Sequence, residues 1–167
     1  SRVLKRCFDI LFSVVMLVGL LPVLGAMSLW IKSVSPKGGV LYKQERVGQN
    51  GKRFFMLKFR SMVPEAELGT GPTMVDEANE TRYIRGGQCL RQWSLDELPQ
   101  LWNIFVGEMS LVGPRPERPH FVDQFSQGVP FFSYRHAVPV GLTGWAQVNG
   151  RSVLTRRPEH KIKYDIY

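Results

Sequence analysis

Two adjacent acids, Asp96 and Glu97, are the residues of this sequence best suited to carry out chemistry. A carboxylate can attack phosphorus as a nucleophile, transfer a proton or bind a divalent cation. The same residues can also be purely structural, because acids at a helix start complement the positive end of the helix dipole and cap the first turn. The pair alone therefore leaves a catalytic and a structural interpretation open.

Basic residues in several separate motifs could turn this acidic pair into a phosphate site. Arginine suits a diphosphate because its planar guanidinium donates two parallel hydrogen bonds. Arg115 is the best defined, since it stands between Pro114 and Pro116 after a glycine and its backbone is therefore stiff. Any of the others, taken alone, could be a solvated surface charge. The candidates are Lys58, Arg60, Arg85, Arg91, Arg115 and Arg151.

The metal-binding potential points to Mg²⁺ and away from zinc. The three histidines lack the spacing of zinc ligands, and the two cysteines, Cys7 and Cys89, form no cluster with them. Carboxylates beside phosphates favour Mg²⁺, which takes one or two acids, waters and substrate oxygens. The sequence contains no GxxxxGK[ST], GxGxxG or GxSxG motif. The separated cysteines also favour a reducing compartment over a disulfide framework.

The overall charge suggests an acidic partner. Lys and Arg number 22 against 14 Asp and Glu, which gives a net charge of +8. Nucleic acid, anionic lipid and sugar nucleotides all qualify. A nucleic-acid binder needs exposed aromatic residues among the basic ones. The aromatic residues near Phe55 alternate as they would in a packed hairpin, so we expect no nucleic-acid partner.

The elements that must position these residues indicate an α+β fold. Strand-like stretches at 40–46 and 53–62 flank an Asn50-Gly51 step, which predicts a β-hairpin. Ser94 and Glu97 satisfy an S-x-x-E capping box, which predicts a helix start at Ser94. Pro99 would then lie inside the second turn, so a start at Asp96 is the alternative.

The other soluble segments are assigned more briefly. We expect a short basic helix at 82–92, a strand at 109–112, a helix near 118–125 and a terminal helix from 159. Residues 64–80 and 139–151 are predicted to be loops. We find neither an internal repeat nor a linker between domains.

An uncharged run from Ile10 to Ile31 precedes this soluble part. A straight helix of that length spans about 33 Å, enough to cross a hydrocarbon core of about 30 Å. The run exceeds the apolar core of a typical signal peptide. A helix apolar on every side is also rarely buried in a soluble domain this small. Membrane insertion is therefore the preferred interpretation.

Pro22, in the middle of the run, favours a hairpin that enters and leaves the same side of the membrane. Proline costs roughly 3 kcal/mol in an unkinked helix. Basic residues precede and follow the run, which places both ends on the cytosolic side. A kinked spanning helix is the alternative. We therefore predict a re-entrant membrane region at 1–34 and a cytosolic catalytic domain at 35–167, forming one structural unit.

Long motifs of the sequence resemble the bacterial sugar transferase family, the monotopic phosphoglycosyl transferases. The resemblance is carried by YKQERVGQNGKRFFMLKFRSM, SLDELPQLWNIFVGEMSLVGPRP, GLTGWAQVNGR and KIKYDIY, in this order, and covers nearly the whole chain. It implies a bacterial cytoplasmic membrane enzyme with its catalytic domain on the cytosolic face. That enzyme would transfer a sugar-1-phosphate from a UDP-sugar to undecaprenyl phosphate and release UMP, beginning capsule, exopolysaccharide or O-antigen assembly.

The resemblance also implies roles for individual residues. Asp96 would attack the β-phosphate as covalent nucleophile and bind Mg²⁺, which predicts ping-pong kinetics. Glu97 would position or deprotonate the polyprenyl phosphate. Arg91 matches a phosphate-associated arginine, while Lys58, Arg115 and Arg151 lie in motifs expected to hold the nucleotide diphosphate.

Some features depart from the family pattern or stay open. Many members have Ser-Pro at the membrane break, whereas this chain has Leu21-Pro22. The family usually continues past its tyrosine-rich ending with another amphipathic segment, whereas this sequence ends at Tyr167. The transferred sugar and the pathway are undetermined, and a homodimer is compatible with the sequence. A catalytically silent membrane scaffold is the competing hypothesis; it predicts that Asp96→Asn preserves function.

Overall fold

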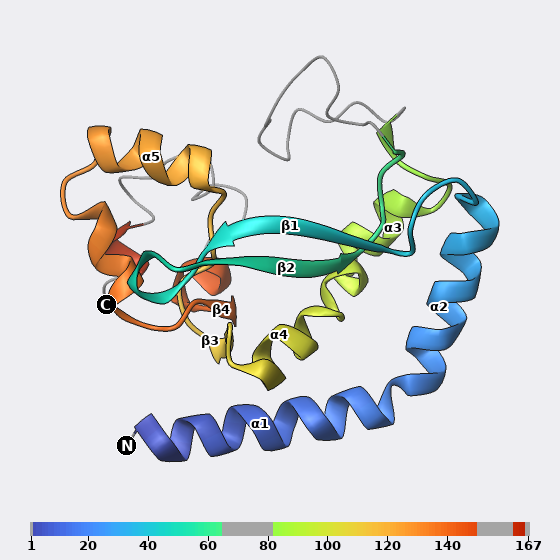
Figure 1. Ribbon diagram of the computed structural model, residues 1–167, viewed down its shortest axis with the longest axis horizontal. Coiled ribbons are helices and arrows are strands. Elements are labelled where there is room, and N and C mark those ends of the chain that lie inside the picture. Colours follow the sequence, from blue (N-terminus) through green and yellow to red (C-terminus); the bar gives the residue numbers. More distant parts are fainter. Residues whose placement is uncertain (1, 65–81, 150–161, 166–167) are drawn as a thin grey trace.

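The computed structural model describes residues 2–64, 82–149 and 162–165. The predicted hairpin is confirmed: strands β1 (Leu41–Val47) and β2 (Arg53–Phe59) pair antiparallel, from Leu41 opposite Phe59 to Val47 opposite Arg53 (Figure 1). The turn is the short 3₁₀ segment η1 (Gln49–Gly51). There Asn50 and Gly51 take φ values of 54° and 74°, the left-handed conformation that Asn-Gly steps adopt readily.

The main core lies between the hairpin and the elements that follow the acidic pair. Phe54 and Met56 of β2 alternate toward this core, as expected for a half-buried strand. They pack against helix α4 (Gln100–Val106) and a small parallel sheet of β3 (Ser110–Val112) and β4 (Gly141–Thr143). The α+β character expected from the sequence is therefore confirmed.

The apolar run forms two helices, α1 (Arg2–Gly19) and α2 (Leu21–Val34), bent by 61°. Pro22 lies in the first turn of α2, where its missing N–H costs no helical hydrogen bond. Neither helix by itself has the length and composition to cross a membrane, whereas the bent pair taken together does. Figure 1 shows α1 below the soluble part and α2 rising along its side.

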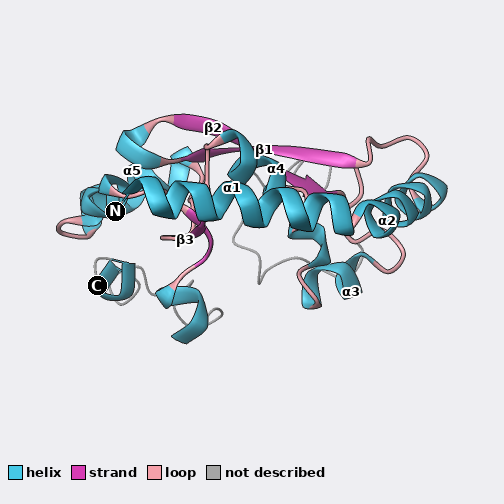
Figure 2. Cartoon of the chain, turned by 90° about the horizontal axis from the view of Figure 1, so that it is seen from below, coloured by secondary structure: helices cyan, strands magenta, loops and turns pink. Residues whose placement is uncertain are grey.

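Polar contacts fix α1 to the soluble part. Asp9, buried at 4% exposure, accepts hydrogen bonds from the Ser110 hydroxyl at 2.8 Å and the Leu111 N–H at 3.2 Å. Arg6 donates at 2.6 Å to each of two carbonyls near the end of α4. Seen from below, α1 runs across the domain close to α4 (Figure 2). Large apolar side chains on the rest of α1, such as Phe8 and Leu11, are exposed.

The predicted helix start at Ser94 is wrong, and so is the alternative at Asp96. Ser94 has a left-handed φ of 56° and makes no capping side-chain bond. It separates α3 (Gly87–Gln92) from a single 3₁₀ turn, η4 (Leu95–Glu97). Helix α4 then begins at Gln100, directly after Pro99. Proline is tolerated at the start of a helix, where its missing N–H would have no helical partner.

The remaining predictions hold in part. The short basic helix is confined to α3, and the helix near 118–125 is confirmed as α5 (Pro119–Gly128). A 3₁₀ segment, η5 (Phe132–Ala137), follows it. The segment 139–151 is wrong as a loop, since it contains β4 and helical residues at 145–149. Residues 162–165 are helical, but most of the expected terminal helix and of the loop at 64–80 lies outside the described residues.

Candidate active site

The acidic pair lies on η4, where two helices meet the end of β2. The left-handed turn at Ser94 redirects the chain after α3, and Pro99 then starts α4. Asp96 and Glu97 are both buried, at 5% and 7% exposure. Burial of two adjacent acids is unfavourable unless cations or hydrogen bonds compensate it. The contacts of each carboxylate therefore indicate what it does.

Among the described residues, two cations hold Glu97. Its Oε1 lies 2.6 Å from Arg115 Nη2 and 3.0 Å from Lys58 Nζ, while Oε2 lies 3.4 Å from Arg115 Nη1. Burial by itself would raise the pKa of Glu97, but Arg115 and Lys58 outweigh it and hold this pKa well below its usual range. Glu97 is therefore ionised and unsuited to accept a proton.

The same contacts shift the two cations in opposite directions. Burial lowers the pKa of Lys58 to about 8, although Glu97 partly opposes this. Burial also acts to lower the pKa of Arg115, but the ion pair and hydrogen bonds with Glu97 raise it overall. Arg115 thus stays charged, whereas Lys58 can lose its proton at mildly alkaline pH.

Asp96 differs sharply from its neighbour. Among the residues that the structure describes, none makes a hydrogen bond or ion pair with its carboxylate. Burial raises its pKa, against the attraction of Lys58, Arg91 and Arg115. Asp96 is thus a carboxylate near several cations but engaged by none, which leaves it available to a substrate.

Backbone contacts with β4 fix the turn that carries Arg115. Gly113 donates its N–H to Thr143 O at 2.9 Å, and Gly141 donates to Pro114 O at 2.8 Å. The two chains approach so closely that a Cβ on Gly113 or Gly141 would collide with the opposing backbone. The glycines are therefore required to seat this turn beside Glu97.

The other predicted binding residues have different placements. Arg91 lies in the last turn of α3, with its guanidinium 5.7 Å from the ring centroid of Tyr83, and its charge acts on Asp96. Arg60 instead donates to Gly39 O at 2.6 Å and lies over the Tyr42 ring at 5.9 Å, so it faces the loop after α2. Arg151 lies outside the described residues.

Sequence reasoning missed Arg46, a buried arginine beside the site. It donates to Pro116 O at 3.1 Å and to Gln44 Oε1 at 2.6 Å, and it lies 3.7 Å from Glu117 Oε2. Burial lowers its pKa to about 10. The alternation of residues along the strands could have predicted this position. Arg46 and Lys58 lie on the same face of the hairpin, the one that packs against the core.

Asp96 is the acid of the pair that could contribute a carboxylate ligand to Mg²⁺. No group of three or more potential metal ligands occurs within the described parts of the chain. Mg²⁺ is commonly bound through one or two carboxylates together with substrate phosphates. Asp96 can supply that one carboxylate, since the Glu97 oxygens are already held by cations.

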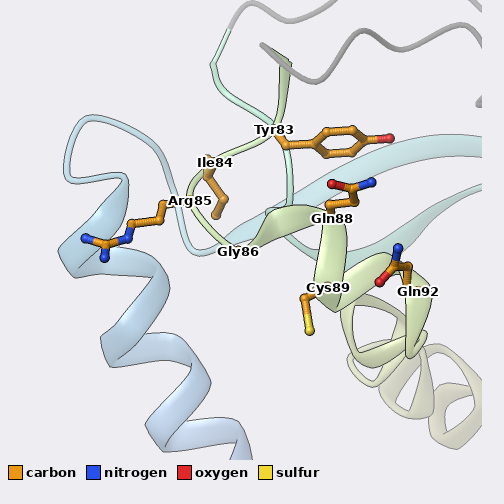
Figure 3. Close-up of a pocket in the computed structure, with 7 residues that line it drawn as sticks. All are labelled: Tyr83, Ile84, Arg85, Gly86, Gln88, Cys89 and Gln92. Atoms are coloured by element: carbon orange, nitrogen blue, oxygen red, sulfur yellow. The ribbon is translucent and has the colours of Figure 1, made fainter.

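A cavity of about 450 Å³ opens beside α3 (Figure 3). The amides of Gln88 and Gln92 lie on one side of it with Tyr83, while Arg85 extends toward α2. Among the described residues, its lining includes no acid. The cavity is therefore a hollow beside α3, and the acidic pair on η4 is not part of its described lining.

The fold thus combines a bent apolar helix pair, which has the length and composition of a membrane segment, with a buried acidic pair that lies among cations. The sequence matches the family described as bacterial sugar transferase over residues 1–167, and the chain belongs to this family. It is 41% identical over 165 residues to the UDP-N-acetylgalactosamine-undecaprenyl-phosphate N-acetylgalactosaminephosphotransferase of Aeromonas hydrophila, covering 98% of this chain and 38% of that protein.

Two further relatives have different sugars in their names. The UDP-glucose:undecaprenyl-phosphate glucose-1-phosphate transferase of Xanthomonas campestris pv. campestris is 40% identical over 167 residues, covering 98% of this chain and 34% of that protein. The UDP-galactose-lipid carrier transferase of Erwinia amylovora is 42% identical over 166 residues, covering 91% and 34%. The chain thus spans little more than a third of the length of these relatives.

Proposed function

We propose that this chain transfers a sugar-1-phosphate from a UDP-sugar to undecaprenyl phosphate and releases UMP. The relatives named above carry such activities in their names, and the chain covers little more than a third of each. The observation that carries the proposal is the contrast between the two acids. Glu97 is held by Lys58 and Arg115, while Asp96 is buried near cations and has no direct partner among the residues that the structure describes.

The reaction proceeds in two displacements at one phosphorus. An Asp96 carboxylate oxygen attacks the β-phosphorus, the bond from this phosphorus to the bridging oxygen breaks, and UMP leaves with that oxygen. A polyprenyl phosphate oxygen then attacks the same phosphorus. The bond to Asp96 breaks, the carboxylate is restored, and a polyprenyl diphosphosugar is formed. A covalent intermediate of this kind divides one difficult step into two.

The surrounding residues support this chemistry by position and charge. Lys58, Arg91 and Arg115 place positive charge where the diphosphate must lie. Glu97 orients Lys58 and Arg115, and its lowered pKa argues for this role over that of a general base. When bound, Mg²⁺ would offset the charge of the diphosphate, and Asp96 is the residue that would hold it.

The bent helix pair supports a position at the cytoplasmic membrane. We propose that α1 and α2 enter and leave the cytosolic leaflet, with the break at Leu20-Leu21-Pro22, and that the domain from residue 35 onward lies on the cytosolic face. The acidic pair would then meet UDP-sugars from the cytosol and the phosphate of a lipid carrier from the membrane. We propose that this reaction is the first membrane step of exopolysaccharide, capsule or O-antigen synthesis.

A direct test is the covalent intermediate. Full-length protein in lipid nanodiscs is incubated with Mg²⁺ and, separately, UDP-glucose, UDP-galactose or UDP-N-acetylgalactosamine. We expect UMP release and a phosphosugar adduct on Asp96 by mass spectrometry with one of these donors, and loss of the adduct on adding undecaprenyl phosphate. Asp96→Asn should show neither signal. A folded wild-type protein without adduct or UMP release for every donor would overturn the proposal.

A further inference from the structure

A second buried ion pair adjoins the turn that carries Arg115. Arg135 of η5 is 1% exposed, and its Nε and Nη2 lie 3.0 and 2.8 Å from Asp165 Oδ2. The same Nη2 donates to the main-chain carbonyl of Arg115 at 2.7 Å. The Arg135 guanidinium also lies 5.1 Å from the ring centroid of Phe132. Asp165 is thereby connected to the site through Arg135.

The Pro-Arg-Pro turn is held by its carbonyls. Pro114 and Pro116 have no N–H, so the turn has few donors with which to hold itself in place. Three successive carbonyls each accept one bond from a different element. Pro114 O accepts from Gly141 N at 2.8 Å, Arg115 O from Arg135 at 2.7 Å and Pro116 O from Arg46 at 3.1 Å.

A buried ion pair is a poor way to gain stability, because the cost of desolvating both charges offsets most of their attraction. Apolar residues could fill the same space. What an arginine supplies, and an apolar residue cannot, is a directed donor to the Arg115 carbonyl. Asp165 orients that donor by accepting a hydrogen bond from Nε and forming an ion pair with Nη2.

We propose that Arg135 and Asp165 are positioning residues of the transfer reaction. They fix the backbone of Arg115, so that its guanidinium meets both Glu97 and the diphosphate of the donor. This inference rests on the function proposed above. It assigns to Asp165 a part in the first displacement, which Asp165 exerts through Arg135 and the backbone of Arg115.

A double-mutant cycle separates positioning from simple stabilisation. Arg135→Lys keeps the charge but cannot donate to Asp165 and Arg115 O in the same geometry. We expect it to slow adduct formation by on the order of 10- to 100-fold, the loss typical of a small misplacement of a binding group. In an Arg115→Lys background the same change should cost less than about threefold, because the group being positioned is already altered.

Asp165→Asn provides a second cycle with a nearly unchanged volume, and it decides the question if Arg135→Lys fails to fold. Arg53→Lys is the matched control, because the ion pair of Arg53 with Glu45 is exposed and far along the hairpin from Lys58. Unfolding temperature is measured for every variant. Non-additive losses with Arg115→Lys support the proposal. Additive losses, or rates equal to those of the Arg53→Lys control, overturn it. If the wild-type protein itself releases no UMP, the proposed function is refuted instead.

Discussion

Arg115 Nη2 lies 2.6 Å from Glu97 Oε1, and Lys58 Nζ shares the same oxygen at 3.0 Å. Neighbouring Asp96 is equally buried but has no such partner among the described residues. Two adjacent buried carboxylates thus differ in their contacts, since Glu97 binds cations directly and Asp96 lies near the same cations without contacting them. Removal of the Asp96 charge should leave the stability of the fold unchanged or raise it, whereas removal of the Glu97 charge should lower it.

Asp96→Asn should abolish adduct formation without weakening the fold. We expect UMP release to fall by roughly 1,000-fold or more, since the proposed nucleophile is removed. The free energy of unfolding should stay constant or rise by up to about 1 kcal/mol, because a buried charge with no direct partner among the described residues is removed. Chemical denaturation and a UMP assay on the same preparation check both parts. Activity near the wild-type level would favour the scaffold hypothesis.

Glu97→Gln should reduce both activity and stability. The change leaves Arg115 and Lys58 without their shared carboxylate, and removal of one partner from a largely buried ion pair costs about 2–4 kcal/mol. The control is Glu45→Gln, whose ion pair with Arg53 is exposed at 3.7 Å and should cost less than about 0.5 kcal/mol. Denaturation midpoints of the two variants distinguish them. Equal stabilities would contradict the role assigned to Glu97.

Activity should fall as the pH rises through about 8, where Lys58 loses its proton in the folded protein. Its ordinary pKa is 10.5. Between these pH values the unfolded chain binds a proton that the folded chain does not, so the Lys58 contribution to stability rises with pH. The alkaline loss of activity should therefore precede any loss of fold. Circular dichroism along the pH series checks that order.

Lys58→Arg tests the assignment of that titration. Its guanidinium remains protonated across this range, so the fall near pH 8 should disappear even if the absolute rate is lower. Lys52→Arg, an exposed change in the hairpin turn, should keep the wild-type profile. A fall near pH 8 that persists in Lys58→Arg would assign the titration to another group.

Local rules in the sequence were enough for the hairpin and for the helix break. Asn50 and Gly51 adopt the left-handed conformation that asparagine and glycine favour in tight turns. Pro22 lies in the first turn of α2, where proline disrupts no helical hydrogen bond. The capping box at Ser94 failed because Ser94 itself is left-handed, which ends one helix and delays the next until after Pro99. A short motif cannot show which of two possible turns the chain will make.

The site was predictable in its residue types more than in its pairings. Arg115 could be singled out because Pro114 and Pro116 flank it, and in the structure its guanidinium donates a hydrogen bond to Glu97. Arg60 and Lys58 are neighbours in sequence, yet Arg60 turns to Gly39 because it follows the last paired residue of β2. The roles of Arg46 and Arg135 depend on carbonyls contributed by a distant turn, and no sequence motif marks such contacts.

The close approach of two backbone segments beside Arg115 gives a final prediction. A Cβ on Gly144 would collide with the Gly113 carbonyl, immediately before the Pro-Arg-Pro turn. Gly144→Ala should therefore push this turn from its place, lowering stability by about 1–3 kcal/mol and slowing adduct formation more than Glu45→Gln does. Gly128→Ala is the control, since nothing lies within 4 Å of its added Cβ. We expect that variant to match or slightly exceed the wild type in stability. If Gly144→Ala keeps full activity, the seating of the turn against β4 does not set the position of Arg115.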